Sequence, residues 1–279
     1  MITLRLSALP RGPVDGDAIT PDTFAGRSPV EIARLPLGDD GGRLGDLFQV
    51  SGSPDDTIRL EGDCSRVTGI GQGMTHGRLE VRGDVGAHAG AAMRGGELIV
   101  HGNAGDWAGV EMRDGLLRVQ GNARNLVGAA YRGGEKGMRG GVILVGGRVG
   151  DEVGSAMRRG VIAVAGAAGD LTGARMIAGS VFVFGALGVA TGAGMKRGTV
   201  VAYRIGTAAS PDGGGGRAGF LPPFRFDCVF RPAWIGLYLR QLRAWGFPVP
   251  ARTEGGVYHR YSGDLTELAK GEILAWTAD

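Results

Sequence analysis

Residues 77–129 read GRLEVRGDVGAHAGAAMRGGELIVHGNAGDWAGVEMRDGLLRVQGNARNLVGA. This stretch repeats one pattern with a step of 19 residues. The methionines mark the same step on both sides of this stretch: Met74, Met93, Met112, Met138, Met157, Met176 and Met195. Between Met112 and Met138 the next slot falls on Tyr131, and the seven residues RGGEKGM that follow are an insertion in one coil. A regular step of this length predicts a repeat architecture.

Other columns obey the same step, counted from the methionine slot. An aliphatic residue stands five residues after it, valine seven after it, and glycine nine and sixteen after it. Alternation of buried and variable positions is typical of a strand with one buried face, and the glycines suit tight corners. Stacking such strands about 4.8 Å apart buries like side chains in files. We therefore predict an all-β fold, a parallel β-helix of 19-residue coils, and favour the right-handed form.

Small residues seventeen positions after the methionine slot suggest a second inward column: Ala91, Val110, Ala129, Ser155, Ala174 and Ala193. Ile58 and Leu60 match Leu79 and Val81 with a step of 21, which predicts an imperfect first coil, and LGDLFQVSG ending at Gly52 is a candidate for another.

The repeat also sets the expected domain limits. Residues 1–43 are expected to form an N-terminal cap, residues 44–203 the β-helix, and residues 204–279 a C-terminal cap or docking segment. The last part begins with a glycine-rich loop and contains a helix that starts at Pro232 and stops before Gly246. On that helix Trp234, Tyr238, Leu242 and Trp245 are predicted to share one face, as either a cap over the last coil or a docking surface.

Composition narrows the class of protein. Glycine makes up 55 of 279 residues, yet 43% of the chain is hydrophobic and regularly placed, which argues against disorder. A formal charge of +3 is too small to indicate nucleic-acid binding. Two distant cysteines, no apolar run of membrane-spanning length and no secretory signal core predict a cytoplasmic protein without a membrane span.

The residue types used in catalysis do not converge in this sequence. His76, His88 and His101 occupy different slots of the coil, which favours hydrogen-bonded or solvated histidines over a metal ladder. Cys64 is expected to be a buried thiol, and Cys228 shares no C-x-x-C pattern with it. The Asp or Asn thirteen residues after the methionine slot is expected to form a turn ladder; this column is Asp106, Asn125, Asp151 and Asp170.

One column is more informative, because the residue directly after the methionine slot is usually a cation. Its candidates are Arg94, Arg113, Arg132, Arg139, Arg158 and Lys196. Stacked coils would place these like charges in a row, where they repel. A long polyanionic ligand or an acidic partner surface explains such a row, and so does pairing with carboxylates of the same chain such as Glu97, Asp114 or Glu135.

The repeat resembles the C-terminal β-helix domain of glutamate synthase large subunits, a structural spacer. With the flanks PDTFAGRSPVEIARLPLG (21–38), GDLFQVSG (45–52) and HRYSGDLTELAKGEIL (259–274), nearly the whole chain is similar to the C subunit of formylmethanofuran dehydrogenase. The segment LPPFRFDCVFRPAWIGLYLRQLRAWG (221–246) and the low lysine content look more like the bacterial version of that family, the C subunit of a formyltransferase/hydrolase complex.

That resemblance implies a non-catalytic scaffold subunit of a one-carbon pathway. The complex moves a formyl group from tetrahydromethanopterin to a methanofuran-type cofactor and hydrolyses it to formate. The partners implied are a formyltransferase subunit, an amidohydrolase-like subunit and an oxidoreductase-like subunit, and these hold the metals and the reacting sites. No catalytic residue, metal site or tightly bound cofactor is expected in this chain. Because methanofuran and methylofuran carry a chain of glutamates, the cation column is a hypothetical polyglutamate contact.

Three alternatives remain open on the sequence. The first is the C subunit of a tungsten or molybdenum formylmethanofuran dehydrogenase. The second is a glutamate-synthase-like spacer, which would need flavin and iron–sulfur domains elsewhere. The third is a polysaccharide lyase or hydrolase on a β-helix, which would need Asp106, Asp151 and Asp170 to converge in a groove.

Overall fold

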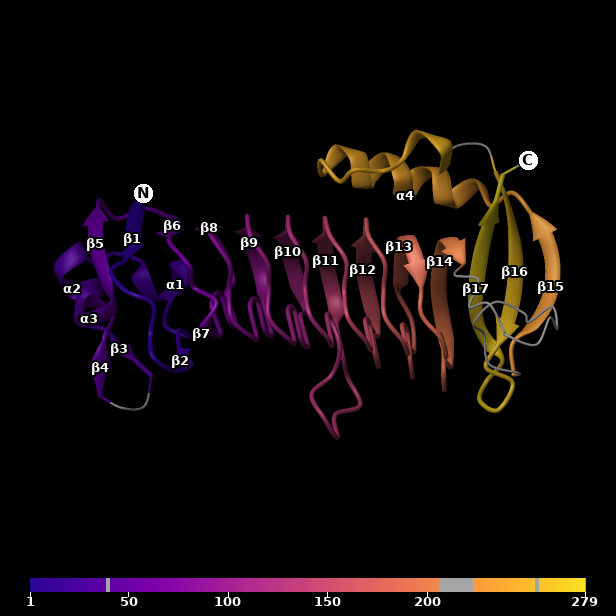
Figure 1. The fold of residues 1–279 in the computed structure, drawn as a ribbon, viewed down its shortest axis with the longest axis horizontal. Helices are drawn as coiled ribbons and strands as arrows, with labels where there is room; N and C mark the ends of the chain where they lie inside the picture. The colour runs from indigo at the N-terminus through magenta and orange to yellow at the C-terminus, as the bar shows by residue number, and fades with distance from the viewer. Residues whose placement is uncertain (39–40, 206–222, 254–255, 279) are drawn as a thin grey trace.

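The computed structural model describes residues 1–38, 41–205, 223–253 and 256–278, and these form a rod of stacked strands (Figure 1). Within them one 13-stranded sheet runs in the order β15-β16-β17-β14-β13-β12-β11-β10-β9-β8-β6-β1-β5. The strands that stack in parallel along the rod are β1 (Ile2–Leu6), β6 (Thr57–Glu61), β8 (Arg78–Arg82), β9 (Arg94–Val100), β10 (Asp114–Val119), β11 (Arg139–Val145), β12 (Arg159–Val164), β13 (Ser180–Leu187), β14 (Arg197–Ile205) and β17 (Lys270–Thr277).

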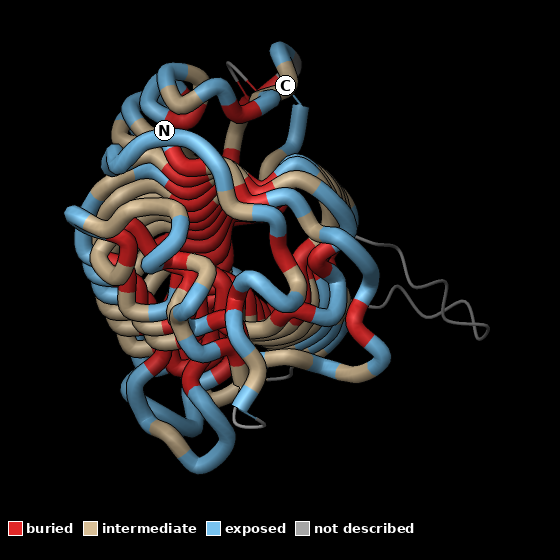
Figure 2. Tube along the Cα trace, turned by 90° about the vertical axis from the view of Figure 1, so that its left-hand side faces the viewer, coloured by how far each residue is buried: buried red, intermediate tan, exposed pale blue. Residues whose placement is uncertain are grey.

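The strand register confirms the β-helix predicted from the repeat. Val81 pairs with Val100, and Val100 with Val119, so the valine column lies in file down the rod. The aliphatic column does the same, and the 21-residue first step also holds, since Ile58 pairs with Leu79. Both files are buried, and seen along the rod the buried positions of successive coils overlie one another (Figure 2).

The second inward column differs from the prediction. The small residues seventeen positions after the methionine slot are mostly buried, but the interior core is filled from the positions eleven and fifteen after it. The eleventh position contributes Val85, Ala104, Ala123, Val149, Ala168 and Leu187. The second inward column is therefore supplied by other positions of the coil than the one predicted. Glycines interrupt the short segments around these positions, so no alternation of buried and exposed residues marks them in the sequence.

Corner glycines meet two physical demands. The glycines sixteen residues after the methionine slot have φ between 65° and 76°, a conformation that side chains rarely adopt. At Gly109 a Cβ would also lie 2.5 Å from Ile143 Cδ1. At Gly83 a Cβ would lie 2.0 Å from the Gly62 carbonyl oxygen of the preceding coil, so close stacking alone requires glycine there.

The N-terminal end is closed by short elements around β1. They are β2 (Val14–Asp15), α1 (Pro21–Phe24), α2 (Pro29–Ala33), β3 (Pro36–Leu37), β4 (Gly42–Arg43), α3 (Leu44–Leu47), β5 (Phe48–Gly52) and β7 (Val67–Thr68). Thr20 and Ser28 cap α1 and α2, and Glu31 completes a capping box. LGDLFQVSG is not an extra coil, because β5 runs antiparallel to β1 at the sheet edge. β1 itself forms the strand that precedes β6.

The C-terminal end is closed by an antiparallel extension of the same sheet. β15 (Arg225–Phe230) pairs with β16 (Val257–Gly263), and β16 pairs with β17, which continues the parallel ladder beyond β14. Phe224, 3% exposed, enters the interior core, and a Cβ at Gly192 would lie 2.6 Å from its ring. This aromatic ring, together with the hairpin, closes the last coil.

The predicted helix is present but does not cap the last coil. α4 (Ala233–Ala244), with η1 (Ala251–Thr253) after it, lies along the outer face of the sheet (Figure 1). Its buried residues are Ile235, Leu239 and Leu242, so of the predicted face only Leu242 is fully buried. They pack on an outward file of the sheet, composed of Leu144, Ala163, Phe182, Val201 and Leu274.

Among the described residues no helix has the length and apolar character that crossing a membrane requires. The glycine-rich loop expected after residue 204 falls on residues 206–222, outside the described residues.

Candidate functional site

Five of the six predicted cations form a file. In each of their coils the backbone N–H of the residue after the methionine donates to the methionine carbonyl of the preceding coil, at 2.6–2.8 Å. The file reads Thr75, Arg94, Arg113, Arg139, Arg158, Ile177 and Lys196. The backbone positions of these five cations therefore lie in file, with an interruption at Ile177.

Arg132 lies outside this file. The amide of Arg139 donates to the Met112 carbonyl at 2.6 Å, and β11 pairs directly with β10, so Met138 fills the slot after Met112. Tyr131 and Arg132 belong instead to the inserted loop, residues 131–137, which projects from the rod. Both are exposed. Including Arg132 in the row was wrong, because the sequence YRGG imitates the MRGG that actually occupies the slot.

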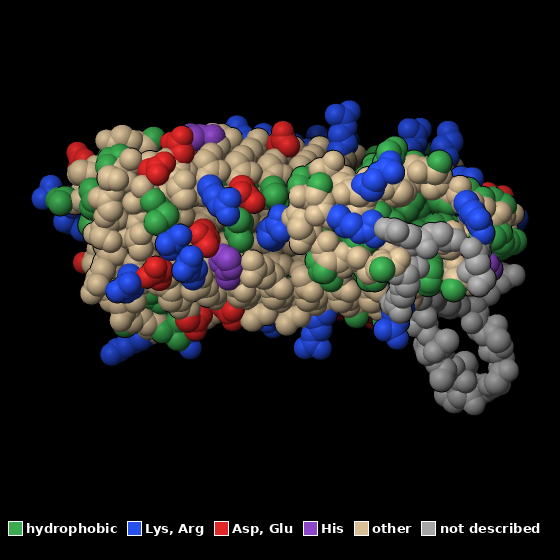
Figure 3. All heavy atoms as spheres, turned by 90° about the horizontal axis from the view of Figure 1, so that it is seen from above, with side chains coloured by type: hydrophobic (Ala, Val, Ile, Leu, Met, Phe, Trp, Pro, Cys, Tyr) green, Lys and Arg blue, Asp and Glu red, His purple; other side chains and the backbone are tan. Residues whose placement is uncertain are grey.

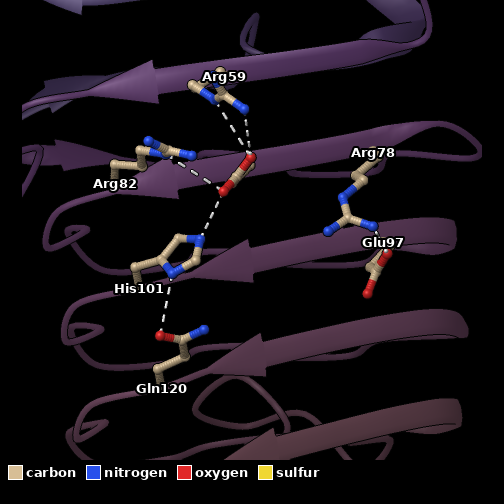
Figure 4. Close-up of polar contacts among 7 residues, drawn as sticks. Arg59, Arg78, Arg82, Glu97, His101 and Gln120 are labelled. Atoms are coloured by element: carbon tan, nitrogen blue, oxygen red, sulfur yellow. Dashed lines mark hydrogen bonds and ion pairs between the residues drawn. The ribbon is translucent and has the colours of Figure 1, made fainter. Parts of the chain in front are cut away.

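Internal pairing accounts for part of the row, through carboxylates other than those expected. Arg139 Nη2 lies 3.5 Å from Glu111 Oε2, and Lys196 Nζ lies 3.9 Å from Glu267 Oε2. Glu97 pairs with Arg78 at 3.1 Å (Figure 4). Asp114 accepts a hydrogen bond from the adjacent Gly115 amide, at 2.8 Å.

Two hollows open where the file passes the inserted loop. One, of about 300 Å³, is lined by Glu135, Ala156, Arg158, Arg175, Ile177, Gly194, Lys196 and Glu267. The other, of about 350 Å³, is lined by Arg139, Arg158, Arg159 and Ile177. Because Arg158 and Ile177 belong to both, the hollows are neighbours. We call the surface formed by Arg139, Arg158, Arg159, Arg175 and Lys196 the cationic groove.

Arg175 was missed by the sequence analysis because its column contains no other cation. It precedes Met176 and donates from Nη2 to Ser155 Oγ at 3.3 Å. Equivalent positions in other coils hold Ala92, Glu111 and Gly194. Only the stacking of coils brings Arg175 beside Arg158.

A short loop holds Glu267 at the end of the groove. Asp264 is buried and accepts hydrogen bonds from Gly194 N at 3.0 Å and from Thr266 N and Oγ1 at 2.9 and 2.7 Å. Burial opposes ionisation of this carboxyl, but the bonds from Thr266 and Gly194 keep its pKa below the usual value. The ionised carboxylate thus ties the loop to the last coil.

The groove combines cations with carboxylates of the same chain. Arginine presents a planar fork of donors that matches a carboxylate. Glu135 and Glu267 line the hollow of Arg158, Arg175 and Lys196, and Glu111 pairs with Arg139. Cations in consecutive coils are spaced by the strand separation, about 4.8 Å.

The histidines have separate structural partners. His76 Nδ1 lies 3.3 Å from Asp22, and His88 stacks on Trp107 with ring centroids 5.2 Å apart. His101 lies between Glu80, at 2.8 Å, and Gln120, at 3.1 Å (Figure 4). Within the described ranges no group of three or more His, Cys, Asp or Glu residues is placed to hold a metal ion.

The polar network of Figure 4 stabilises an ionised carboxylate on the outer face of the sheet. Partial burial opposes ionisation of Glu80, but the bond with His101 and the positive charges of Arg59 and Arg82 hold its pKa below the usual value. Arg59 and Arg82 lie 3.3 and 3.5 Å from its carboxylate oxygens.

The Asp and Asn column forms the expected turn ladder. Asn125 N donates to Asp106 Oδ1, Asp151 N to Asn125 Oδ1, and Asp170 N to Asp151 Oδ1, at 2.8–3.0 Å. A second ladder, through Asp84, Asn103 and Asn122, was not predicted. Cys64 is buried, as expected, and burial raises the pKa of its thiol to about 12.

Comparison with known proteins finds similarity to the C subunits of two kinds of enzyme complex. No protein-family model matches it. It is 40% identical over 89 residues to the C subunit of tungsten-containing formylmethanofuran dehydrogenase 2 from Methanothermobacter wolfeii, covering 29% of this chain and 33% of that protein. It is 36% identical over 88 residues to the C subunit of formyltransferase/hydrolase complex Fhc from Methylorubrum extorquens, covering 31% and 33%. These matches thus span about a third of the curated relatives.

Structural similarity extends over the whole chain. A chain in the crystal structure of the formyltransferase/hydrolase complex (FhcABCD) from Methylorubrum extorquens, in complex with methylofuran, superposes with a TM-score of 0.88. It is 35% identical in sequence, and the match covers 98% of each chain.

Proposed function

The chain belongs to the C-subunit family of formylmethanofuran dehydrogenases and formyltransferase/hydrolase complexes, and from this we propose that it is a scaffold subunit of a formyltransferase/hydrolase complex. The observation that carries the proposal is the match over 98% of both chains, at 35% identity, to a chain of such a complex. The reaction assigned to the assembly is formyl transfer from tetrahydromethanopterin to a methanofuran-type cofactor, followed by hydrolysis to formate.

The architecture supports a structural role. A rod whose coils repeat the same buried files is stiff along its length, and it presents long side faces to which other subunits can attach. The proposed partners are a formyltransferase subunit, an amidohydrolase-like subunit and an oxidoreductase-like subunit, with the reacting groups held by them. We also propose a cytoplasmic location and a division into an N-terminal cap (1–43), a β-helix (44–203) and a C-terminal cap or docking segment (204–279). Three strands cross these limits, because β5 belongs to the N-terminal closure and β1 and β17 belong to the parallel ladder.

A second candidate is the C subunit of a tungsten- or molybdenum-containing formylmethanofuran dehydrogenase. It is favoured by local identities of 40% over 89 residues and 39% over 82 residues to such subunits. The two candidates share the fold and differ in their partner subunits, so only the composition of the native assembly separates them.

We propose that the cationic groove contacts the carboxylates of a methylofuran-type cofactor or of an acidic partner. Three of the predicted residues, Arg139, Arg158 and Lys196, line it directly. Arg94 and Arg113 continue the same file away from the hollows and are exposed. Methylofuran is present in the similar crystal structure, and its glutamate chain has the repeated negative charge that the groove suits.

Purification of the native complex tests the subunit assignment. Co-elution with a formyltransferase chain, in a preparation without tungsten or molybdenum, is the expected result. Co-elution with a tungsten or molybdenum enzyme would support the second candidate instead. Elution of this chain without any partner would overturn both.

Charge-neutralised variants of the complex test the groove. Arg139→Gln, Arg158→Gln and Lys196→Gln together should lower binding of an oligoglutamate peptide at least tenfold, which equals about 1.4 kcal/mol, and should flatten its salt dependence. Arg124→Gln with Arg148→Gln is the matched control, because both arginines are exposed at the same level of the rod but line a different hollow. Equal losses in the two sets would refute a specific groove.

A further inference from the structure

The outward side of α4 carries more apolar surface than its packing requires. Leu237 is 59% exposed, and among the described large hydrophobic residues only Val30, at 61%, is more exposed. Trp234 and Tyr238 belong to the same helix and are half-buried, with ring centroids 5.6 Å apart and planes at 79°. Tyr238 also packs on Phe182 of the sheet, at 5.3 Å. The exposed leucine is therefore on the side of α4 that faces away from the sheet, next to two rings held by packing.

The same segment is uniformly basic. Residues 228–253 contain Arg231, Arg240, Arg243 and Arg252 but no Asp, Glu or Lys. Arg231, Arg240 and Arg243 line a hollow of about 480 Å³ between α4 and the residues Thr253, Gly256 and Tyr258, with Ile235 and Leu239 as further apolar walls. From above, hydrophobic and basic side chains predominate over α4, while acidic ones gather mainly toward the other end of this face (Figure 3).

We propose that the outer face of α4 is the docking site of a partner subunit that offers an apolar pocket bordered by carboxylates. The inference rests on the proposed function, since it requires an assembly. Tryptophan, tyrosine and arginine are enriched at the centres of protein interfaces, where lysine is depleted. Leu237 enters the partner's pocket, Trp234 and Tyr238 pack around it, and the exposed Arg240 faces a partner carboxylate.

Charge argues against one alternative occupant, and packing argues against the other. A second copy of this chain, related by a twofold axis, would bring the same arginine-bearing surface against itself without any acidic residue from α4 to pair with it. An anionic lipid surface would attract the arginines. However, helices that lie on membranes bury a broad apolar face, and the apolar face of α4 is already packed on the sheet.

Substitution at Leu237 in the co-expressed complex, with an affinity tag on a partner subunit, tests the proposal. Leu237→Asp should lower the amount of this chain recovered with the tag at least tenfold, and Leu237→Met should restore it. Val30→Asp is the matched control, because Val30 is equally exposed but lies on α2 at the other end of the rod. Arg240→Glu should weaken recovery most at low salt, where charge pairs are least screened.

Each outcome separates the possible explanations. Wild-type recovery of Leu237→Asp would overturn the docking proposal, while failure of the wild-type chain to co-purify would overturn the proposed function instead. A variant that leaves the complex intact but turns a dimer of this chain into a monomer would identify a second copy as the occupant. Loss of binding to vesicles containing anionic lipid, with the complex intact, would identify a membrane. Either of the last two results overturns the proposal.

Discussion

Replacing Asn125 by alanine tests whether the side-chain ladder holds neighbouring coils together. Asn125 Nδ2 donates to Asp106 Oδ1, and its Oδ1 accepts from the Asp151 amide, both at 3.0 Å. Alanine removes both bonds and leaves the Asp151 N–H without its acceptor. One bond joins neutral groups, worth about 0.5–1.5 kcal/mol, and the other involves a carboxylate, worth about 1.5–3 kcal/mol in full burial.

Because Asn125 is half-buried, water can replace part of the hydrogen bonding that the substitution removes. We expect Asn125→Ala to lower the free energy of unfolding by about 2 kcal/mol, which corresponds to a fall in Tm of about 4–8 °C. Thermal unfolding followed by circular dichroism measures it. Asp114→Ala is the control, because Asp114 accepts from the adjacent Gly115 in its own coil, and its effect should stay within about 0.5 kcal/mol.

Aspartate at the same position makes the test sharper. Asn125→Asp keeps an acceptor for the Asp151 amide but places a second carboxylate 3.0 Å from Asp106 Oδ1. The variant should be destabilised at neutral pH and recover as acid protonates one carboxyl of the pair. Equal Tm values for Asn125→Ala and Asp114→Ala, or no effect of acid on Asn125→Asp, would refute the idea that the ladder joins the coils.

Three further outcomes follow from burial and charge. In the native chain, dithionitrobenzoate at pH 8 should modify the exposed Cys228 but not Cys64, whose thiol has a pKa raised to about 12, and urea should expose both. Asp264→Asn should lower Tm at pH 7. Since the folded-state pKa of Asp264 is depressed, its stabilisation is fully present above the unfolded pKa, about 3.9. Wild type and variant should therefore converge only as pH falls from that value through the lower folded-state pKa. Leu117→Ala removes a side chain from the fully buried aliphatic file and should lower the free energy of unfolding by about 2.7–5 kcal/mol, measured by denaturant unfolding. A decrease under about 1 kcal/mol would contradict stacked files.

The repeat predicted the interior files because one physical requirement sets them. Each strand buries an aliphatic residue and a valine against the equivalent residues of the preceding coil. The 19-residue spacing therefore identifies Leu79, Leu98 and Leu117 as neighbours. The position of the helix was not predicted, although the sequence contains an indication of it. The outward column six residues after the methionine slot reads Glu80, Ile99 and Arg118 and is then apolar without interruption from Leu144 onward, where α4 packs.

The candidate site was predictable only where it follows the repeat. Arg139 and Arg158 were found because the slot fixes their file. Arg132 was misplaced because YRGG and MRGG match the pattern equally well, and only the stacking of Met138 after Met112 decides between them. Arg175 had no column to mark it, since its role depends on contacts between coils.

The surfaces proposed to bind other molecules lie where the chain departs from its repeat. A rod of identical coils provides even spacing of charge but no means of choosing a position along its length. Glu135 from the inserted loop and Glu267 from the C-terminal loop both line the cationic groove, so two departures from the repeat bound one stretch of the positive file. α4 is a third departure, and it supplies an apolar and basic surface over the coils that lie near that stretch. In the proposed arrangement the repeat sets the geometry, and its interruptions determine where along the rod an anion or a partner would be recognised.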